Sequence, residues 1–307
     1  MTNRLLVMDI GGSKTRVRVL DTAGNIFSET VTTGMAIAND SDAPLPALED
    51  ILGKLDNKDA IVCAAVNLGG KNTGQVRSSI GKIFPAIPIK IFRESEGTAA
   101  YALGEKYGAP IILMAGTGAI AVGHSEKGFI TSGGWGANIS DSGSGYDIGL
   151  QAIRMSLSAL DDVEPLSPMI RALCGLDHTI SAAPDPSVVR DMRDNVREKF
   201  SPFERQHIAA FTKTVAEFAE KNDPVALQIF HDAGEKLSEL VIKTAKKLDI
   251  SPTTVVVTGG LINAQKFWAQ SFEAALPGFT IHYVHDGLLY GTYLIAKDLY
   301  EKGDTGL

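Results

Sequence analysis

The chain has 307 residues, of which 44% are hydrophobic and 21% are charged, and it carries a formal net charge of −7 at pH 7. This length fits about two domains, and the composition is that of a globular protein, so disorder, collagen and a coiled coil are excluded as descriptions of the whole chain. An acidic chain with no basic block is also not expected to bind nucleic acid through its phosphates.

No segment of the sequence predicts export or membrane insertion. The first apolar run covers only residues 5–8, which is too short for a signal peptide. The longest stretch without Asp, Glu, Lys or Arg, residues 107–125, contains a proline and several glycines, which favour two strands and a turn over a membrane span. Cys63 and Cys174, the two cysteines, cannot build a disulfide framework. We therefore expect a soluble, cytoplasmic protein with no membrane partner.

The first third of the chain is rich in predicted strands. Residues 4–10 form an apolar run, residues 15–21 alternate between apolar and polar side chains, and residues 26–31 complete a third strand. Glycine-containing turns at residues 11–14 and 23–25 separate these strands. The pattern predicts a three-stranded meander.

After the meander, helices and strands alternate. Residues 44–55 show a helical spacing of leucine and isoleucine, and residues 60–66 form a continuous apolar run typical of a central parallel strand. A short strand follows at residues 89–92 and an alanine-rich helix at residues 97–107. Together with the meander, this order predicts a mixed sheet with helices on its faces.

The rest of the chain repeats this theme. Strands are predicted at residues 111–114, 119–123 and 129–131, and a glycine-rich segment, residues 133–149, leads into a mostly helical region. Strand, helix, strand and helix then follow at residues 253–257, 261–276, 281–284 and 288–302. No sequence repeat of fixed period is visible, so the repeat is architectural. We expect two similar α/β halves around a cleft, with two unrelated lobes as the alternative.

The turn after the first predicted strand has the composition of a phosphate site. Glycines let a ligand approach the backbone closely, successive N–H groups bind anions, and hydroxyl and ammonium groups add hydrogen bonds and charge. Asp9, at the end of the strand, is the candidate ligand for Mg²⁺, directly or through water. The turn joins two strands and lacks the P-loop and GxGxxG spacings, and an ordinary hairpin turn is the alternative. The residues expected to bind phosphate are Gly11, Gly12, Ser13, Lys14 and Thr15.

Two further glycine turns lie at equivalent strand ends. Gly116, Thr117 and Gly118 occupy the matching turn of the second half, where we expect them to hold the same phosphates from the other side. Gly259 and Gly260 stand between a buried strand and a helix, which suits a nucleoside base or ribose lying against the backbone. Each turn is a weak signal by itself, and the three together predict a nucleotide site.

A fourth glycine-rich segment, residues 133–146, reads GGWGANISDSGSGY. With the three turns, it resembles the BadF/BadG/BcrA/BcrD ATPase family, which includes N-acetylglucosamine kinase and belongs to the actin, hexokinase and Hsp70 (ASKHA) superfamily. The resemblance spans nearly the whole chain, and its motifs occur in the family's order. It implies a two-lobed actin-like ATPase fold, related to ribonuclease H, with a ligand cleft between the lobes. The implied lobes are residues 1–108 with 288–307, and residues 109–287 with a helical insertion.

The resemblance also implies which residues bind a sugar. Gly134, Trp135 and Thr117 would line the sugar site, and Asp141 would accept hydrogen bonds from sugar hydroxyls. The alternative for Trp135 is an aromatic side chain that fills the interface between the lobes.

By the same resemblance, Glu96 is the catalytic base. The family has Asp in an Asn-Asp-Ala type of motif before a helix of small residues, whereas this chain has Ser95 and Glu96 there. Glutamate is one methylene longer than aspartate, which shifts the base relative to the substrate. Glu94 is the second candidate, and an acidic residue that only interacts with the helix dipole is the structural alternative.

Other departures concern the sugar itself. Ser140 and Ser142 flank Asp141 where the family has Gly and an acidic residue, and Asn39 could replace a family Asn only with an insertion. These differences leave the identity of the sugar open.

The predicted function is ATP-dependent phosphorylation of an amino sugar or a related hexose, with ATP and Mg²⁺ as cofactors. One alternative is a non-catalytic sugar or nucleotide sensor on a kinase scaffold. Another is an ATPase activator of a dehydratase, which needs cysteines for an iron–sulfur cluster that Cys63 and Cys174 are not placed to hold. A small sugar is the expected partner, nucleic acid is not, and a homodimer stays open.

Overall fold

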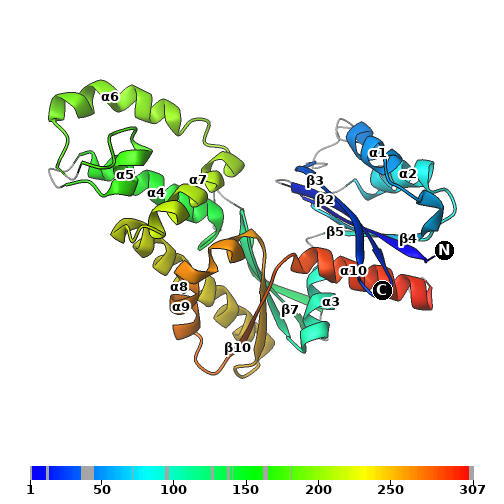
Figure 1. The fold of residues 1–307 in the computed structure, drawn as a ribbon. Helices are drawn as coiled ribbons and strands as arrows, with labels where there is room; N and C mark the ends of the chain where they lie inside the picture. The colour runs from blue at the N-terminus through cyan, green and yellow to red at the C-terminus, as the bar shows by residue number, and fades with distance from the viewer. Residues whose placement is uncertain are drawn as a thin grey trace. The chain divides into compact units, whose positions relative to one another are not determined.

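The computed structural model describes residues 2–11, 14–35, 45–70, 72–93, 97–125, 128–136, 139, 141–161, 165–180 and 182–303. The chain divides into two compact units, each with its own sheet (Figure 1). Unit 1 contains Met1–Ile112, Glu126–Phe129 and Asp286–Leu307, and unit 2 contains Leu113–Ser125 and Ile130–His285.

Unit 1 is built on a mixed five-stranded sheet in the order β3-β2-β1-β4-β5. β1 and β3 are antiparallel to β2, whereas β4 is parallel to both β1 and β5. The predicted meander and the central parallel strand are therefore confirmed. The strands are β1 (Arg4–Ile10), β2 (Lys14–Asp21), β3 (Ile26–Thr33), β4 (Ile61–Leu68) and β5 (Ile89–Arg93).

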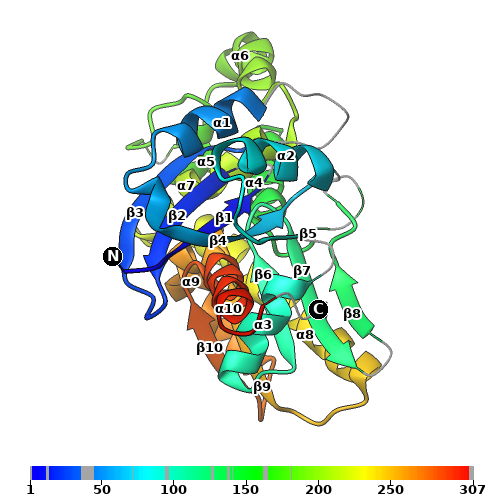
Figure 2. The same cartoon turned by 90° about the vertical axis from the view of Figure 1, so that its right-hand side faces the viewer.

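One face of this sheet is covered by α1 (Leu45–Gly53) and α2 (Thr73–Ile83) (Figure 2). Leu6 and Met8 of β1 pack into the core on this face, because alternate side chains of a strand point to the same side. The sequence pattern of residues 73–83 does not predict α2. The parallel pairing of β4 with β5 nevertheless requires a crossover connection between them, and a helix usually forms it.

The opposite face of the same sheet is covered by α3 (Thr98–Tyr107) and α10 (Gly287–Lys302), which pack beside each other (Figure 2). Leu5 and Val7 of β1 lie in one core cluster with Leu289 of α10. The last helix of the chain thus completes the core around the first sheet.

Unit 2 contains a second five-stranded sheet in the order β10-β9-β6-β7-β8. β6 is the central strand, as β1 is in unit 1. β7 and β8 follow it on one side, as β2 and β3 do, and β9 and β10 on the other, as β4 and β5 do, so the strand order of unit 1 is repeated. This repeat confirms the predicted architecture of two similar α/β halves. The strands are β6 (Ile111–Ala115), β7 (Ala119–Ser125), β8 (Gly128–Gly133), β9 (Thr254–Thr258) and β10 (Thr280–Val284).

Most helices of unit 2 lie between β8 and β9 in the sequence. Asp223 caps the longest of them, α8, by accepting hydrogen bonds from the backbone N–H groups of Val225 and Ala226. α9 (Gln265–Ala274) packs beside α8 (Figure 1). No helix within the described ranges is both long and apolar enough to cross a membrane. The inserted helices are α4 (Gly145–Ala159), α5 (Pro168–Leu173), α6 (Pro186–Lys199), α7 (Arg205–Ala219) and α8 (Pro224–Leu248).

Candidate functional site

In unit 1, the predicted metal ligand Asp9 lies near the end of β1 and is partly buried. Asn67 of β4 donates a hydrogen bond from Nδ2 to Asp9 Oδ1 at 2.8 Å. Burial raises the pKa of the Asp9 carboxyl group above its usual range, and the hydrogen bond from Asn67 and the charge of Arg16 offset only part of this effect. A divalent cation beside this carboxylate would therefore stabilise its charged form.

The first glycine turn uses its polar groups partly within the protein. The N–H of Gly11 donates to the carbonyl oxygen of Lys14 at 3.0 Å, which closes the turn between β1 and β2. Thr15 is buried, and its hydroxyl oxygen accepts a hydrogen bond from the N–H of Met35 at 3.1 Å. Lys14 is exposed. The other two residues expected to bind phosphate here, Gly12 and Ser13, lie outside the described residues.

An ion-pair network next to this turn was missed in the sequence. Arg16 and Arg18 of β2 both pair with Asp286, the residue before α10, and Arg18 Nη2 also lies 3.0 Å from Glu29 Oε1. Burial opposes ionisation of Asp286, yet the two arginines outweigh it and hold the pKa of that carboxyl group below its usual range. The network fastens the start of α10 to β2. No sequence pattern pointed to it, because 270 residues separate Arg16 from Asp286.

In unit 2, the second glycine turn binds the start of α4. The N–H of Gly116 donates to the carbonyl oxygen of Gly118 at 2.8 Å, which closes the turn. The N–H groups of Gly145 and Tyr146 donate to the carbonyl oxygens of Gly116 and Thr117 at 2.8 and 3.1 Å. The first N–H groups of a helix have no partner inside the helix, so these contacts satisfy two of them and fix the turn on α4.

Asp141 lies in the segment just before α4, and its side chain is only 1% exposed. Arg205, the first residue of α7, donates from Nη2 to Asp141 Oδ2 at 2.8 Å. Asp141 Oδ1 is buried and, in the part of the chain that the structure describes, accepts no hydrogen bond. A buried carboxylate oxygen without a partner is rare in a folded protein, so Asp141 Oδ1 has the capacity to accept a further hydrogen bond.

The start of α4 is further fixed by a capping box. The hydroxyl oxygen of Ser144 accepts a hydrogen bond from the N–H of Asp147, and Asp147 Oδ2 accepts one from the N–H of Gly143 at 2.9 Å. Lys236 of α8 donates to the same carboxylate oxygen at 2.9 Å. The segment that carries Asp141 is therefore held in place from two helices.

The third glycine turn lies against the second one. Gly259 has a φ of 110°, and a Cβ atom at this position would come within 2.2 Å of the carbonyl oxygen of Ala115 at the end of β6. A Cβ atom on Gly116 would lie 3.7 Å from the N–H nitrogen of Gly260. The structure thus brings the turn 116–118, Asp141 and the turn 259–260 together within unit 2.

The Gly-Gly-Trp segment follows β8. Gly134 has a φ of 71° and donates its N–H to the carbonyl oxygen of Ala119 at 2.9 Å. Trp135 is 71% exposed, so its ring is not used to stabilise the core. An exposed tryptophan among glycines leaves an aromatic face for a ligand.

The proposed catalytic bases, Glu96 and Glu94, lie outside the described residues, as do Ser95, Ser140 and Asn39. The described chain resumes at Gly97, which has a φ of 68° and precedes α3. In the sequence, one residue, Gly97, separates Glu96 from the first residue of this helix, and the role of Glu96 stays a prediction.

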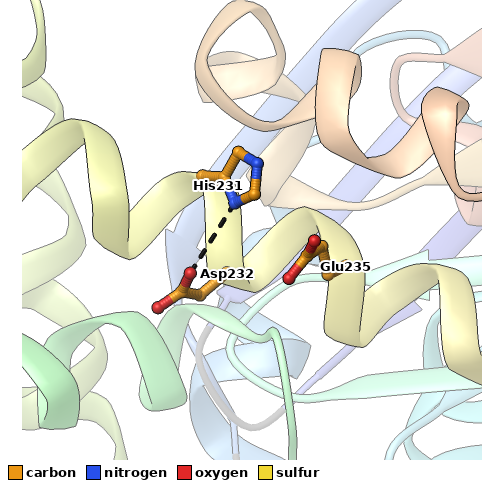
Figure 3. A group of neighbouring side chains, drawn as sticks. All are labelled: His231, Asp232 and Glu235. Atoms are coloured by element: carbon orange, nitrogen blue, oxygen red, sulfur yellow. Dashed lines mark ion pairs between the residues drawn. The ribbon is translucent and has the colours of Figure 1, made fainter.

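A group of metal-ligating side chains lies elsewhere, on α8. Figure 3 shows His231, Asp232 and Glu235, whose ligand atoms lie within 4.8 Å of one another. His231 Nδ1 is 3.7 Å from Asp232 Oδ1, and both side chains are about half exposed. All three come from one helix, and among the described residues no second element contributes a ligand, so this group has the character of a solvated surface cluster.

Comparison with known proteins shows the family of this chain. The family model described as the BadF/BadG/BcrA/BcrD ATPase family matches residues 8–278. The N-acetylmuramic acid/N-acetylglucosamine kinase of Clostridium acetobutylicum is 27% identical, over 94% of this chain and 97% of its own. The N-acetyl-D-glucosamine kinase of Dictyostelium discoideum is 29% identical, over 50% of this chain and 46% of its own.

Solved structures share the fold of the whole chain. A proposed N-acetylglucosamine kinase from Porphyromonas gingivalis has a TM-score of 0.67 and 17% identity, covering 97% of this chain and 99% of its own. A ROK family glucokinase from Streptomyces griseus, solved with glucose and AMPPNP, has a TM-score of 0.59 and 16% identity, covering 97% and 99%. The expected actin-like ATPase fold is confirmed. Since the family model extends from β1 to the loop after α9, this protein belongs to the BadF/BadG/BcrA/BcrD ATPase family.

Proposed function

We propose that this protein is an ATP-dependent kinase of an N-acetylated amino sugar. Sugar kinase is the activity in the names of both curated relatives, and both act on N-acetylated sugars. The observation that carries the proposal is that the buried carboxylate of Asp141 lies beside Gly118, in a turn that itself lies against the turn of Gly259 and Gly260. Such turns let a nucleotide approach the main chain, and the carboxylate accepts hydrogen bonds from sugar hydroxyls.

In the proposed reaction, the acceptor hydroxyl oxygen of the sugar forms a bond to the γ-phosphorus of ATP. The bond from that phosphorus to the β–γ bridging oxygen breaks, and ADP leaves with the electron pair. Glu96 takes the hydroxyl proton, and Asp141 orients the sugar. Trp135 offers its exposed ring to the sugar face. Asp9 would hold Mg²⁺, which supplies charge neutralisation for the phosphates when bound; a partly buried carboxylate with one oxygen fixed by Asn67 fits that role.

The dehydratase-activator alternative receives no support from the cysteines. Cys63 and Cys174 are both buried, and burial raises the pKa of their thiols to about 12 and about 11. A cluster ligand must be a thiolate, so these thiols are poor ligands at neutral pH. Iron bound to the purified protein would overturn this conclusion.

The proposed function is tested by ADP release in the presence of a panel of hexoses and N-acetylated amino sugars. We expect turnover with an N-acetylated sugar and a fall in kcat of about 10²–10⁴-fold in Glu96→Gln. Glu94→Gln is the matched control and keeps the activity. Loss of turnover in Glu94→Gln alone would transfer the role of base to that residue. Sugar binding in a calorimeter without any ADP release would instead identify a sensor.

A further inference from the structure

Arg205 lies against the second glycine turn, and the proposed reaction gives it no role. A Cβ atom on Gly118 would come within 2.1 Å of Arg205 Nη2 and 3.3 Å of Arg205 Cζ, so the guanidinium group lies directly over the bare Cα of this glycine. The same Cβ atom would lie 3.1 Å from Asp141 Oδ2. A side chain at residue 118 would therefore displace the guanidinium group from its present position beside Asp141. The guanidinium group connects the expected phosphate turn with the expected sugar ligand.

The Arg205 guanidinium group forms an ion pair with Asp141, and its side chain is otherwise partly exposed to solvent. Its Nη2 donates to Asp141 Oδ2 at 2.8 Å, and the Asp141 side chain is only 1% exposed, so this contact lies in the protein interior. The Arg205 side chain is 49% exposed. An arginine has five N–H donors, and Asp141 is its one acceptor among the described residues. Several donors thus remain available beside the second glycine turn.

We propose that Arg205 is a further catalytic residue, which binds the phosphoryl group during its transfer; this inference rests on the proposed function. As the sugar oxygen bonds to the γ-phosphorus and the bond to the leaving ADP oxygen breaks, negative charge spreads over the three equatorial oxygens of the transferred group. A planar guanidinium group donates two parallel hydrogen bonds to such oxygens. The sugar proton goes to Glu96, so Arg205 remains charged throughout.

A purely supporting role for Arg205 explains less of the geometry. Neutralising Asp141 needs one cation at one distance, and a lysine would supply it. Such a role does not explain why the guanidinium group lies against Gly118 of the turn, with further donors exposed beside it. In this arrangement the two carboxylate oxygens of Asp141 have different roles. Oδ2 accepts the hydrogen bond from Arg205, and Oδ1 is left for a sugar hydroxyl.

The first test compares Arg205→Lys and Arg205→Gln with the wild type in the ADP-release assay. We expect kcat to fall about 10²–10³-fold in Arg205→Gln, with the KM for the sugar changed less than about threefold. Arg205→Lys keeps the charge beside Asp141 but not the two-point contact, so most of the loss remains. Arg193→Gln removes an exposed ion pair to Asp161, 3.5 Å long, and is the matched control with wild-type kinetics.

A second variant displaces Arg205 without changing it. Gly118→Ala places a methyl group where the guanidinium group now lies, so kcat falls and the pair with Asp141 breaks. If Gly118→Ala acts through Arg205, the double variant Gly118→Ala/Arg205→Gln is about as slow as Arg205→Gln alone. Fully additive losses would overturn the inference.

Binding measurements separate this inference from the proposed function. ADP with aluminium fluoride mimics the transferred phosphoryl group, and we expect it to raise the Tm of the wild type more than that of Arg205→Gln. Equal shifts in both proteins would overturn the role of Arg205, as would a raised KM for the sugar with unchanged kcat. If the wild type phosphorylates no sugar, the proposed function fails, and the Tm comparison still decides whether Arg205 binds the phosphoryl mimic.

Discussion

Units 1 and 2 place their polar residues differently, although their strands follow the same order. In unit 1, charged side chains stand on the strands themselves: Asp9 of β1 faces Arg16 of β2 in the antiparallel register. In unit 2, β6 is buried along its whole length, and the charges beside its turn, Asp141 and Arg205, come from the segments before and within the inserted helices.

The difference shows that a repeated strand order does not determine which polar residues lie near the ends of the strands. The strand order fixes where the first strand of each unit ends and where the following turn lies. The strand order does not fix which residues supply the polar groups near that turn. Unit 1 uses ionised side chains on the sheet, and unit 2 uses bare backbone and a charged pair from outside the sheet. Variants of each feature test whether this division is real.

The largest effect is expected for the carboxylate of unit 1. Asp9→Asn keeps an oxygen that accepts the hydrogen bond from Asn67 but removes the charge, so we expect kcat to fall by about 10²-fold or more with Mg²⁺.

The Asp9→Asn variant does not lose stability at neutral pH. Because burial raises the pKa of Asp9, the wild-type fold loses free energy of unfolding as pH rises from about 3.9 through the raised value, and the variant is spared this loss.

Steady-state kinetics against Mg²⁺ concentration and urea unfolding between pH 4 and 8 measure both effects. Asp56→Asn, a change at an exposed position of the same unit, is the control and alters neither. Full activity of Asp9→Asn would contradict a metal role for unit 1 and would weaken the division between the units.

A second variant tests the close backbone approach in unit 2. In Gly259→Ala, the new methyl group meets the carbonyl oxygen of Ala115 at 2.2 Å and the residue must keep a φ of 110°, so we expect a loss of about 3–5 kcal/mol in free energy of unfolding. At the neighbouring Gly260, a Cβ atom has nothing within 4 Å, and Gly260→Ala should change stability by less than about 1 kcal/mol. Equal losses for the two variants in urea unfolding would mean that the approach is not required.

The smallest effect is expected for the ion-pair network of unit 1. Asp286→Asn removes a carboxylate that Arg16 and Arg18 share, and asparagine tolerates the φ of 55° at this position. With the Asp286 side chain 35% exposed, solvent screening limits the loss to about 1 kcal/mol. The pKa of Asp286 is lowered, so the contribution is present above the usual carboxyl range and is lost as pH falls through the lowered value.

Thermal unfolding from pH 2 to 7 measures this contribution of Asp286. The wild type and Asp286→Asn should differ at neutral pH and converge in acid. A constant difference at every pH would assign the effect to packing and not to charge.

The sequence predicts the strands well because each carries a local pattern. The alternation of residues 15–21 and the apolar run of residues 60–66 are visible without any partner, and β2 and β4 form there. α2 lacks such a pattern, since Gly74, Gly81 and several polar residues dilute its apolar face. Only the requirement for a crossover between parallel strands could have revealed it.

The charged pairs beside the turns are not predictable in this way. Asp141 stands in a recognisable motif, but its partner Arg205 is 64 residues away at the start of a different helix. Neither the spacing nor the composition of residues around Arg205 distinguishes it from the other arginines of the insertion. Contacts of this kind arise from how α4 and α7 pack, which a local reading of one sequence does not contain.

The return of α10 to the first sheet has a consequence for synthesis on the ribosome. The face of the sheet that carries Leu5 and Val7 is fully covered only when Leu289 and Leu299 of α10 pack on it. In the nascent chain α3 can cover part of this face, but the part under α10 stays exposed until α10 has been translated, and unit 2 can finish folding first. This order predicts that unit 1 depends on chaperones until α10 has been translated, and that truncations within α10 make it more prone to aggregate.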